Sequence, residues 1–177
     1  MTMFDTILND ARNGDQQSLM SLYDICCTTV FNASFRILLN EQDAEEVTQD
    51  AILKAFSLLH SFKGTQRDFV AFVKTIAINK SIDEYRKFKR LPLHVDIKEI
   101  SYDKGNDDND DEIFSIDKVK KAIDDLPEGY RLVITLRLLE EMEYEDIANT
   151  LNINASSVRS QYSRGIAKLR EVLRVKF

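Results

Sequence analysis

Hydrogen-bond donors gather in the last fifth of the chain, and they suit contact with a nucleic acid better than covalent chemistry. Hydroxyls at the start of a predicted helix and cations along one side of it make up the set: Ser156, Ser157, Arg159, Ser160, Arg164 and Lys168. Guanidinium groups pair with base edges, and hydroxyl or ammonium groups bind phosphate oxygens. We expect Arg159 and Ser160 to reach base edges. We expect Ser157, Arg164 and Lys168 to bind phosphates.

Two short helices must position these donors, and the sequence indicates how they are joined. Ile147, Ala148 and Leu151 repeat at helical spacing and mark one buried stripe. Asn152 tolerates the left-handed conformation of a tight turn, and Asn154 can cap the next helix. The pattern predicts a helix-turn-helix whose second helix enters a major groove. An ordinary amphipathic pair in a helical bundle would explain the stripe but not the basic face.

Charge is distributed unevenly along this chain of 177 residues, whose net charge is −6. Residues 149–177 carry six Lys/Arg against one Glu, and residues 63–90 carry eight against three acidic residues, so each segment has a net charge of +5. These segments favour a polyanionic partner, although a basic surface can also serve only solubility. The stretch 91–117 has a net charge of −7 and little to bury, which predicts a mobile linker over 91–113. That linker either competes with DNA for the basic faces or only stays solvated.

A second set of side chains lies on a helix predicted near residues 43–59. Asp43, Glu46 and Asp50 share one face at i, i+3 and i+7, with Gln49 beside them. A di-metal site in a helical bundle would need Glu-x-x-His pairs, and the sequence has none. We therefore do not expect these carboxylates to bind a metal.

The remaining sequence favours an all-α protein that is neither an enzyme nor a membrane protein. Gly and Pro are few, and Leu, Ile, Ala, Glu and Lys recur in long runs. No set of side chains has metal-ligand spacing, and no phosphate-binding glycine loop or nucleophile elbow occurs, so we expect no cofactor. The start of the chain lacks a signal-peptide pattern and no apolar run could span a bilayer, which favours the cytoplasm. Cys26 and Cys27 are adjacent in a helical stretch and are expected to be free thiols.

The order of these motifs resembles that of bacterial sigma factors. The segment 43–50 resembles their second conserved region, and 72–86 resembles the stretch that follows it. Leu126-Pro127, Leu136-Arg137 and the segment 144–148, with the basic helix after them, resemble the fourth region. The order, spacing and short acidic linker are similar to those of the extracytoplasmic-function (ECF) subgroup. Three residues depart from the usual pattern of that family. Phe72 stands where the family usually has Trp, and Ile78 stands where it often has a basic residue. Glu141 stands where it commonly has Gly.

The resemblance implies two small helical domains joined by a flexible acidic linker, namely region 2 over 1–90, the linker over 91–113 and region 4 over 114–177. Region 2 would dock on the Arg-rich clamp coiled coil of the polymerase β-prime subunit through Asp43, Glu46, Gln49 and Asp50. Region 2 would also bind and melt the −10 promoter element through Lys63, Arg67, Asn79, Lys80, Asp83 and Arg86. Region 4 would bind the −35 element in duplex form through Arg137 and the donors of the basic helix.

The resemblance also implies partners, and two other functions remain open at this point. A sigma factor would be monomeric when free, would direct core RNA polymerase to promoter DNA, and would be held by an anti-sigma factor. A helix-turn-helix repressor or activator that is not a polymerase subunit would need a ligand pocket or a dimer interface in the first block. An all-helical adaptor without a DNA role would not need the clustered cations of the last helix.

Overall fold

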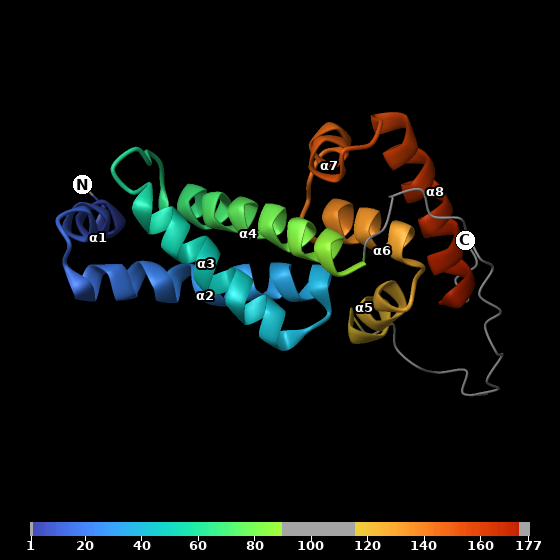
Figure 1. The fold of residues 1–177 in the computed structure, drawn as a ribbon, viewed down its shortest axis with the longest axis horizontal. Coiled ribbons are helices and arrows are strands. Elements are labelled where there is room, and N and C mark those ends of the chain that lie inside the picture. Colours follow the sequence, from blue (N-terminus) through green and yellow to red (C-terminus); the bar gives the residue numbers. More distant parts are fainter. Residues whose placement is uncertain (1, 90–115, 174–177) are drawn as a thin grey trace. The chain divides into compact units, whose positions relative to one another are not determined.

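The computed structural model describes residues 2–89 and 116–173, and all elements in these ranges are helices. The all-α prediction is confirmed. The chain forms two compact units, at 1–90 and 91–177, and each is described here by itself (Figure 1). The acidic linker predicted over 91–113, and its competition with DNA, lie outside the described residues.

The first unit is built from α1 (Met3–Arg12), α2 (Gln16–Leu38), α3 (Glu41–Ser57) and α4 (Gln66–Lys89). The long helices α2 and α4 lie alongside each other, α3 packs on both, and α1 packs on α2 (Figure 1). Helices α3 and α4 are therefore neighbours. The predicted docking residues lie on α3, and Arg67, Asn79, Lys80, Asp83 and Arg86 lie on α4.

Side-chain caps set where these helices begin. Asn40 accepts a hydrogen bond from the Asp43 backbone N–H at 3.1 Å, so α3 begins at Glu41 rather than at Asp43. Asp68 lies at the start of a predicted helix and its residue type commonly caps helices, so the sequence favours it as the cap of α4, but this expectation is wrong. Thr65 occupies the cap position, and its backbone N–H and hydroxyl both donate to Asp68 Oδ2 at 2.8 Å. The bond from the Thr65 backbone, and then that from its hydroxyl, lower the pKa of Asp68.

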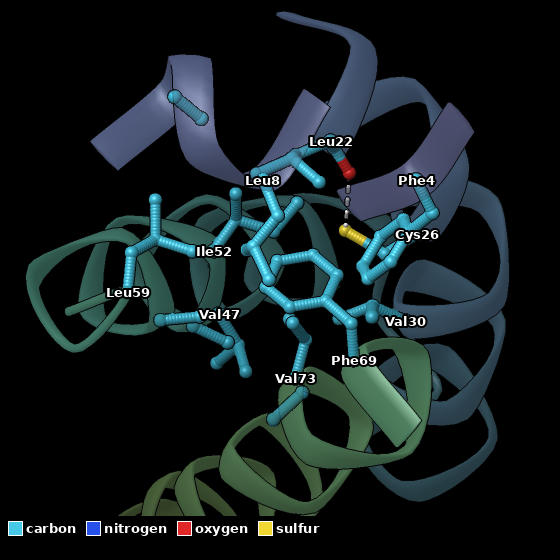
Figure 2. Packing of buried hydrophobic residues seen from close by; sticks show 14 residues of the cluster. Phe4, Leu8, Leu22, Cys26, Val30, Val47, Ile52, Leu59, Phe69 and Val73 are labelled. Atoms are coloured by element: carbon cyan, nitrogen blue, oxygen red, sulfur yellow. Dashed lines mark hydrogen bonds between the residues drawn. The ribbon is translucent and has the colours of Figure 1, made fainter. Parts of the chain in front are cut away.

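The core of the first unit joins one apolar stripe from each helix (Figure 2). Phe69 lies at its centre, in ring contact with Phe4 and Phe62, and Phe62 also contacts Phe72 at 5.6 Å between centroids. Phe72 is therefore an aromatic anchor at the position where the family that the sequence resembles usually has Trp. Cys26 is buried in this core and donates to the Leu22 carbonyl at 3.2 Å, and burial raises the pKa of its thiol to about 12.

The second unit comprises α5 (Ile116–Asp124), α6 (Glu128–Ile134), the π-helical turn η1 (Thr135–Leu139), α7 (Tyr144–Leu151) and α8 (Ala155–Val172). The sequence predicts one helix from Tyr130 to Leu139, and the structure divides that stretch into α6 and η1. Helix α8 packs closely on α6 at Gly165, where an added Cβ would lie 2.7 Å from Ile134 Cδ1. A small residue at this crossing brings the two helix backbones together.

Candidate nucleic-acid interface

The predicted helix-turn-helix is present. Helix α7 ends at Leu151, and the next residue, Asn152, adopts the left-handed conformation (φ 54°, ψ 46°). Helix α8 begins three residues after Asn152. Ile147, Leu151 and Val158 are fully buried between the two helices and their surroundings. Asn154 occupies the cap position of α8, but its side chain makes no capping hydrogen bond there. Packing and the Asn152 turn therefore hold α8 against α7.

The turn that leads into the helix-turn-helix depends on a second left-handed residue. Glu141 has φ 58°, a conformation that favours glycine. The Met142 backbone N–H donates to the Leu136 carbonyl at 3.0 Å and closes the turn. Arg137 Nη1 then donates to the Met142 carbonyl at 3.0 Å and lies 3.3 Å from Glu143 Oε1. Glu141 thus adopts a left-handed backbone conformation at the position where the family that the sequence resembles commonly has Gly.

The donor side chains of α8 are accessible. Ser156, Arg159, Ser160 and Arg164 are exposed, whereas Ser157 and Lys168 are half-buried. Arg137 belongs to η1, where its Nη1 contacts the entrance turn. Its guanidinium carbon and that of Arg159 lie 5.1 and 5.5 Å from the centroid of the same Tyr144 ring.

Two residues that the sequence analysis did not single out contact Arg159. Its Nη2 donates to Glu145 Oε1 at 2.6 Å, and its guanidinium carbon lies 5.5 Å from the centroid of the Tyr144 ring. Both partners lie in the first turn of α7. Helical periodicity describes each helix alone and therefore gives no signal for a pairing between side chains of two helices.

In the first unit, the structure brings Asp43, Glu46 and Asp50 together at one hollow between α3 and α4. Lys80 and Glu84 of α4 line the same hollow, and Lys80 Nζ lies 2.8 Å from Asp50 Oδ2. The resemblance places Lys80 among the residues that would bind the −10 element, and in the structure its Nζ also contacts the carboxylate face.

Gln49 does not line that hollow. It lines a second hollow between α2 and α3, together with Glu45, Thr48, Tyr23, Cys27, Thr28 and Phe31. Successive residues of a helix are about 100° apart, so Gln49 points to a different side of α3 from Asp50. The four residues predicted as one docking face therefore divide between two neighbouring surfaces.

The other residues predicted to bind the −10 element are all at least partly exposed. Lys63, Arg67 and Asn79 are exposed, and Arg86 Nη1 forms an ion pair with Asp83 Oδ1 at 3.3 Å. Within residues 2–89 and 116–173, no cluster of three or more His, Cys, Asp or Glu could hold a metal ion. No helix in these ranges combines the length and hydropathy needed to cross a membrane.

Comparison with known proteins identifies the family. Residues 22–91 match sigma-70 region 2, and residues 116–169 match sigma-70 region 4. The chain is similar to the ECF RNA polymerase sigma factor SigW of Bacillus subtilis, with 28% identity covering 94% of this chain and 95% of the relative. It is also similar to the ECF RNA polymerase sigma-E factor of Escherichia coli K12, with 31% identity covering 69% of each chain.

The chain is an ECF RNA polymerase sigma factor. As such it directs promoter recognition by RNA polymerase and is not itself an enzyme, which sets aside the repressor and adaptor alternatives. Two solved structures share the fold. The first is CnrH in complex with the cytosolic domain of CnrY, with a TM-score of 0.52 and 22% identity covering 96% of each chain. The second is RpoE in complex with the anti-sigma factor NepR from Bartonella quintana, with a TM-score of 0.55 and 24% identity covering 92% of this chain and 98% of that one.

Proposed function

We propose that the two units of this sigma factor divide the promoter between them. Residues 1–90 act as region 2, which docks on core polymerase and binds the −10 element, and residues 114–177 act as region 4, which binds the −35 element. The observation that carries this proposal is the exposed donor face of α8 on a helix-turn-helix. Run-off transcription by purified core polymerase with this chain tests it. Altering either element of a cognate promoter should then abolish the specific transcript.

The docking surface is the carboxylate face of α3. Asp43, Glu46 and Asp50 lie together there, and Leu53, one turn further along the same helix, is 64% exposed. Carboxylates beside an exposed apolar residue suit the Arg-rich coiled coil of the β-prime clamp. Gln49 contributes from the adjoining α2–α3 hollow.

Charge reversal tests this surface. Glu46→Lys with Asp50→Lys should weaken core binding by a few kcal/mol, because two attractive charges become repulsive at a partly desolvated interface. The control pair Asp10→Lys with Asp24→Lys changes the net charge equally at exposed sites on α1 and α2. If both pairs reduce binding alike in a pull-down, the effect comes from net charge and not from this face.

The −10 element is bound by the outer side of α4 and the loop before it. Asn79, Asp83 and Arg86 recur at i, i+4 and i+7, while Lys63 and Arg67 lie in and after the loop that precedes α4. An unpaired base must leave the stack to be read, and a loop beside a basic helix can receive it. Asn79→Ala should reduce open-complex formation on duplex promoters more than on templates with a pre-melted −10 region if its role is in melting.

The −35 element is bound by α8. Arg159→Ala should cost roughly 1–3 kcal/mol and relax preference at one or two base pairs. Lys168→Ala should instead weaken binding on all sequences and make the salt dependence shallower. Arg137 supports the entrance turn through Nη1. A uniform loss from both α8 substitutions would contradict this division of roles.

The proposed partners follow from the family. The RpoE neighbour is a complex with the anti-sigma factor NepR, and we extend that kind of partner to this chain. The free protein is a cytoplasmic monomer that awaits core polymerase. Light scattering of the purified chain gives the free oligomeric state directly, and a stable dimer would contradict the proposal.

A further inference from the structure

The side chain proposed to read a base is held by two neighbours before any DNA binds. Arg159 donates to Glu145 at 2.6 Å and lies over the Tyr144 ring at 5.5 Å. That ring is itself fixed, because the Arg137 guanidinium lies 5.1 Å from its centroid and the Tyr162 ring meets it edge-on at 5.8 Å. Tyr162 belongs to α8 and Arg137 to η1, so two other elements define one position for Tyr144.

We propose that Glu145 and Tyr144 are positioning residues for promoter reading, which hold the Arg159 guanidinium in the orientation that meets a base edge. The inference rests on the proposed base-reading role of Arg159. The structure supports it because Arg159 is held and yet accessible. Its side chain is 54% exposed, and the contact with Glu145 uses one nitrogen of a group that carries five N–H donors.

Preorganisation gives this contact its effect on specificity. A free arginine side chain samples many rotamers, and ordering it on DNA reduces the free energy gained from a bidentate contact. Glu145 and Tyr144 order the guanidinium plane in the free protein. A freed Arg159 would still be attracted to any phosphate within reach, so its loss of order would lower base discrimination more than overall affinity.

A competing account assigns Glu145 no positioning role. A carboxylate near the DNA also repels phosphates, and its removal would then raise affinity for every sequence equally. Asp146 separates the two accounts, because it is an exposed carboxylate in the same first turn of α7. Asp146→Ala removes the same charge next to Glu145, while the carboxylate that contacts Arg159 remains in place.

The test uses holoenzyme reconstituted from core polymerase and the full chain, bound to a duplex promoter library randomised in the upstream element. The readout is base discrimination, the ratio of affinities within one preparation, which does not depend on the fraction of protein that is folded. Glu145→Ala and Tyr144→Leu should lower discrimination roughly 5- to 10-fold at the base pairs that Arg159→Ala relaxes. Asp146→Ala and the ring-preserving Tyr144→Phe should leave that discrimination unchanged.

Two results overturn the inference in distinguishable ways. If Glu145→Ala and Asp146→Ala both raise affinity uniformly and leave discrimination intact, Glu145 only repels phosphate, while the base-reading role of Arg159 stands. If Arg159→Ala itself weakens all sequences equally, the base-reading role falls, and the positioning role of Glu145 and Tyr144 falls with it.

Discussion

Replacement of Glu141 by glycine should stabilise the second unit. Glu141 adopts φ 58° at the turn between η1 and α7, and the left-handed conformation costs an L-residue roughly 1–2 kcal/mol. Glycine removes that cost but loses more backbone entropy on folding, by roughly 0.5–1 kcal/mol. The difference leaves a net gain of about 0–1.5 kcal/mol, centred near 0.75 kcal/mol, in the free energy of unfolding for Glu141→Gly.

The gain is measurable by calorimetry of the full chain. For a unit of this size, a gain of that order raises Tm by roughly 2–8 °C. Glu141→Ala is the matched control, because it removes the same exposed carboxylate but keeps a Cβ in the left-handed region. Alanine should therefore give no comparable increase. Equal shifts for the two variants would show that the side-chain charge, and not the backbone conformation, sets the stability of this turn.

Three further predictions concern stability and thiol chemistry. Gly165→Ala should lower the Tm of the second unit, because the added Cβ would lie 3.1 Å from Tyr130 Cβ, an atom that cannot move without the backbone of α6. Overpacking there costs about 1–3 kcal/mol, which equals or exceeds the helix-propensity gain of about 1 kcal/mol, and a higher Tm would contradict the close crossing. A thiol reagent should modify half-buried Cys27 in the native chain and Cys26 only after unfolding, and rapid reaction of both thiols in the native chain would refute this. The free energy of unfolding should fall as pH rises from 9 towards 12, because in this range the Cys26 thiol ionises in the unfolded chain but not in the folded one. Because the pKa of Asp68 is lowered in the folded state, its ionised carboxylate stabilises the fold above the ordinary pKa of 3.8, and this stabilisation is lost as pH falls through the folded-state pKa. Asp68→Asn should therefore lower Tm at neutral pH, and the Tm difference should shrink in acid. A Tm difference independent of pH would exclude ionisation as its source.

The sequence by itself determined the features that depend on neighbours along the chain. The buried stripe of α7, the left-handed turn at Asn152 and the shared face of Asp43, Glu46 and Asp50 all follow from helical periodicity and local turn chemistry. The family resemblance extended these features to a function. These features are predictable from the sequence because an α-helix has 3.6 residues per turn whichever element it packs against.

Only the tertiary structure decided which side chains meet across helices. Lys80 pairs with Asp50 over a separation of 30 residues, and Arg159 pairs with Glu145 over 14. Gln49 contributes to a different hollow from Asp50, since the position of α2 beside α3 creates that second hollow. Such pairings depend on how apolar stripes dock and at what crossing, and local periodicity contains no information on that geometry.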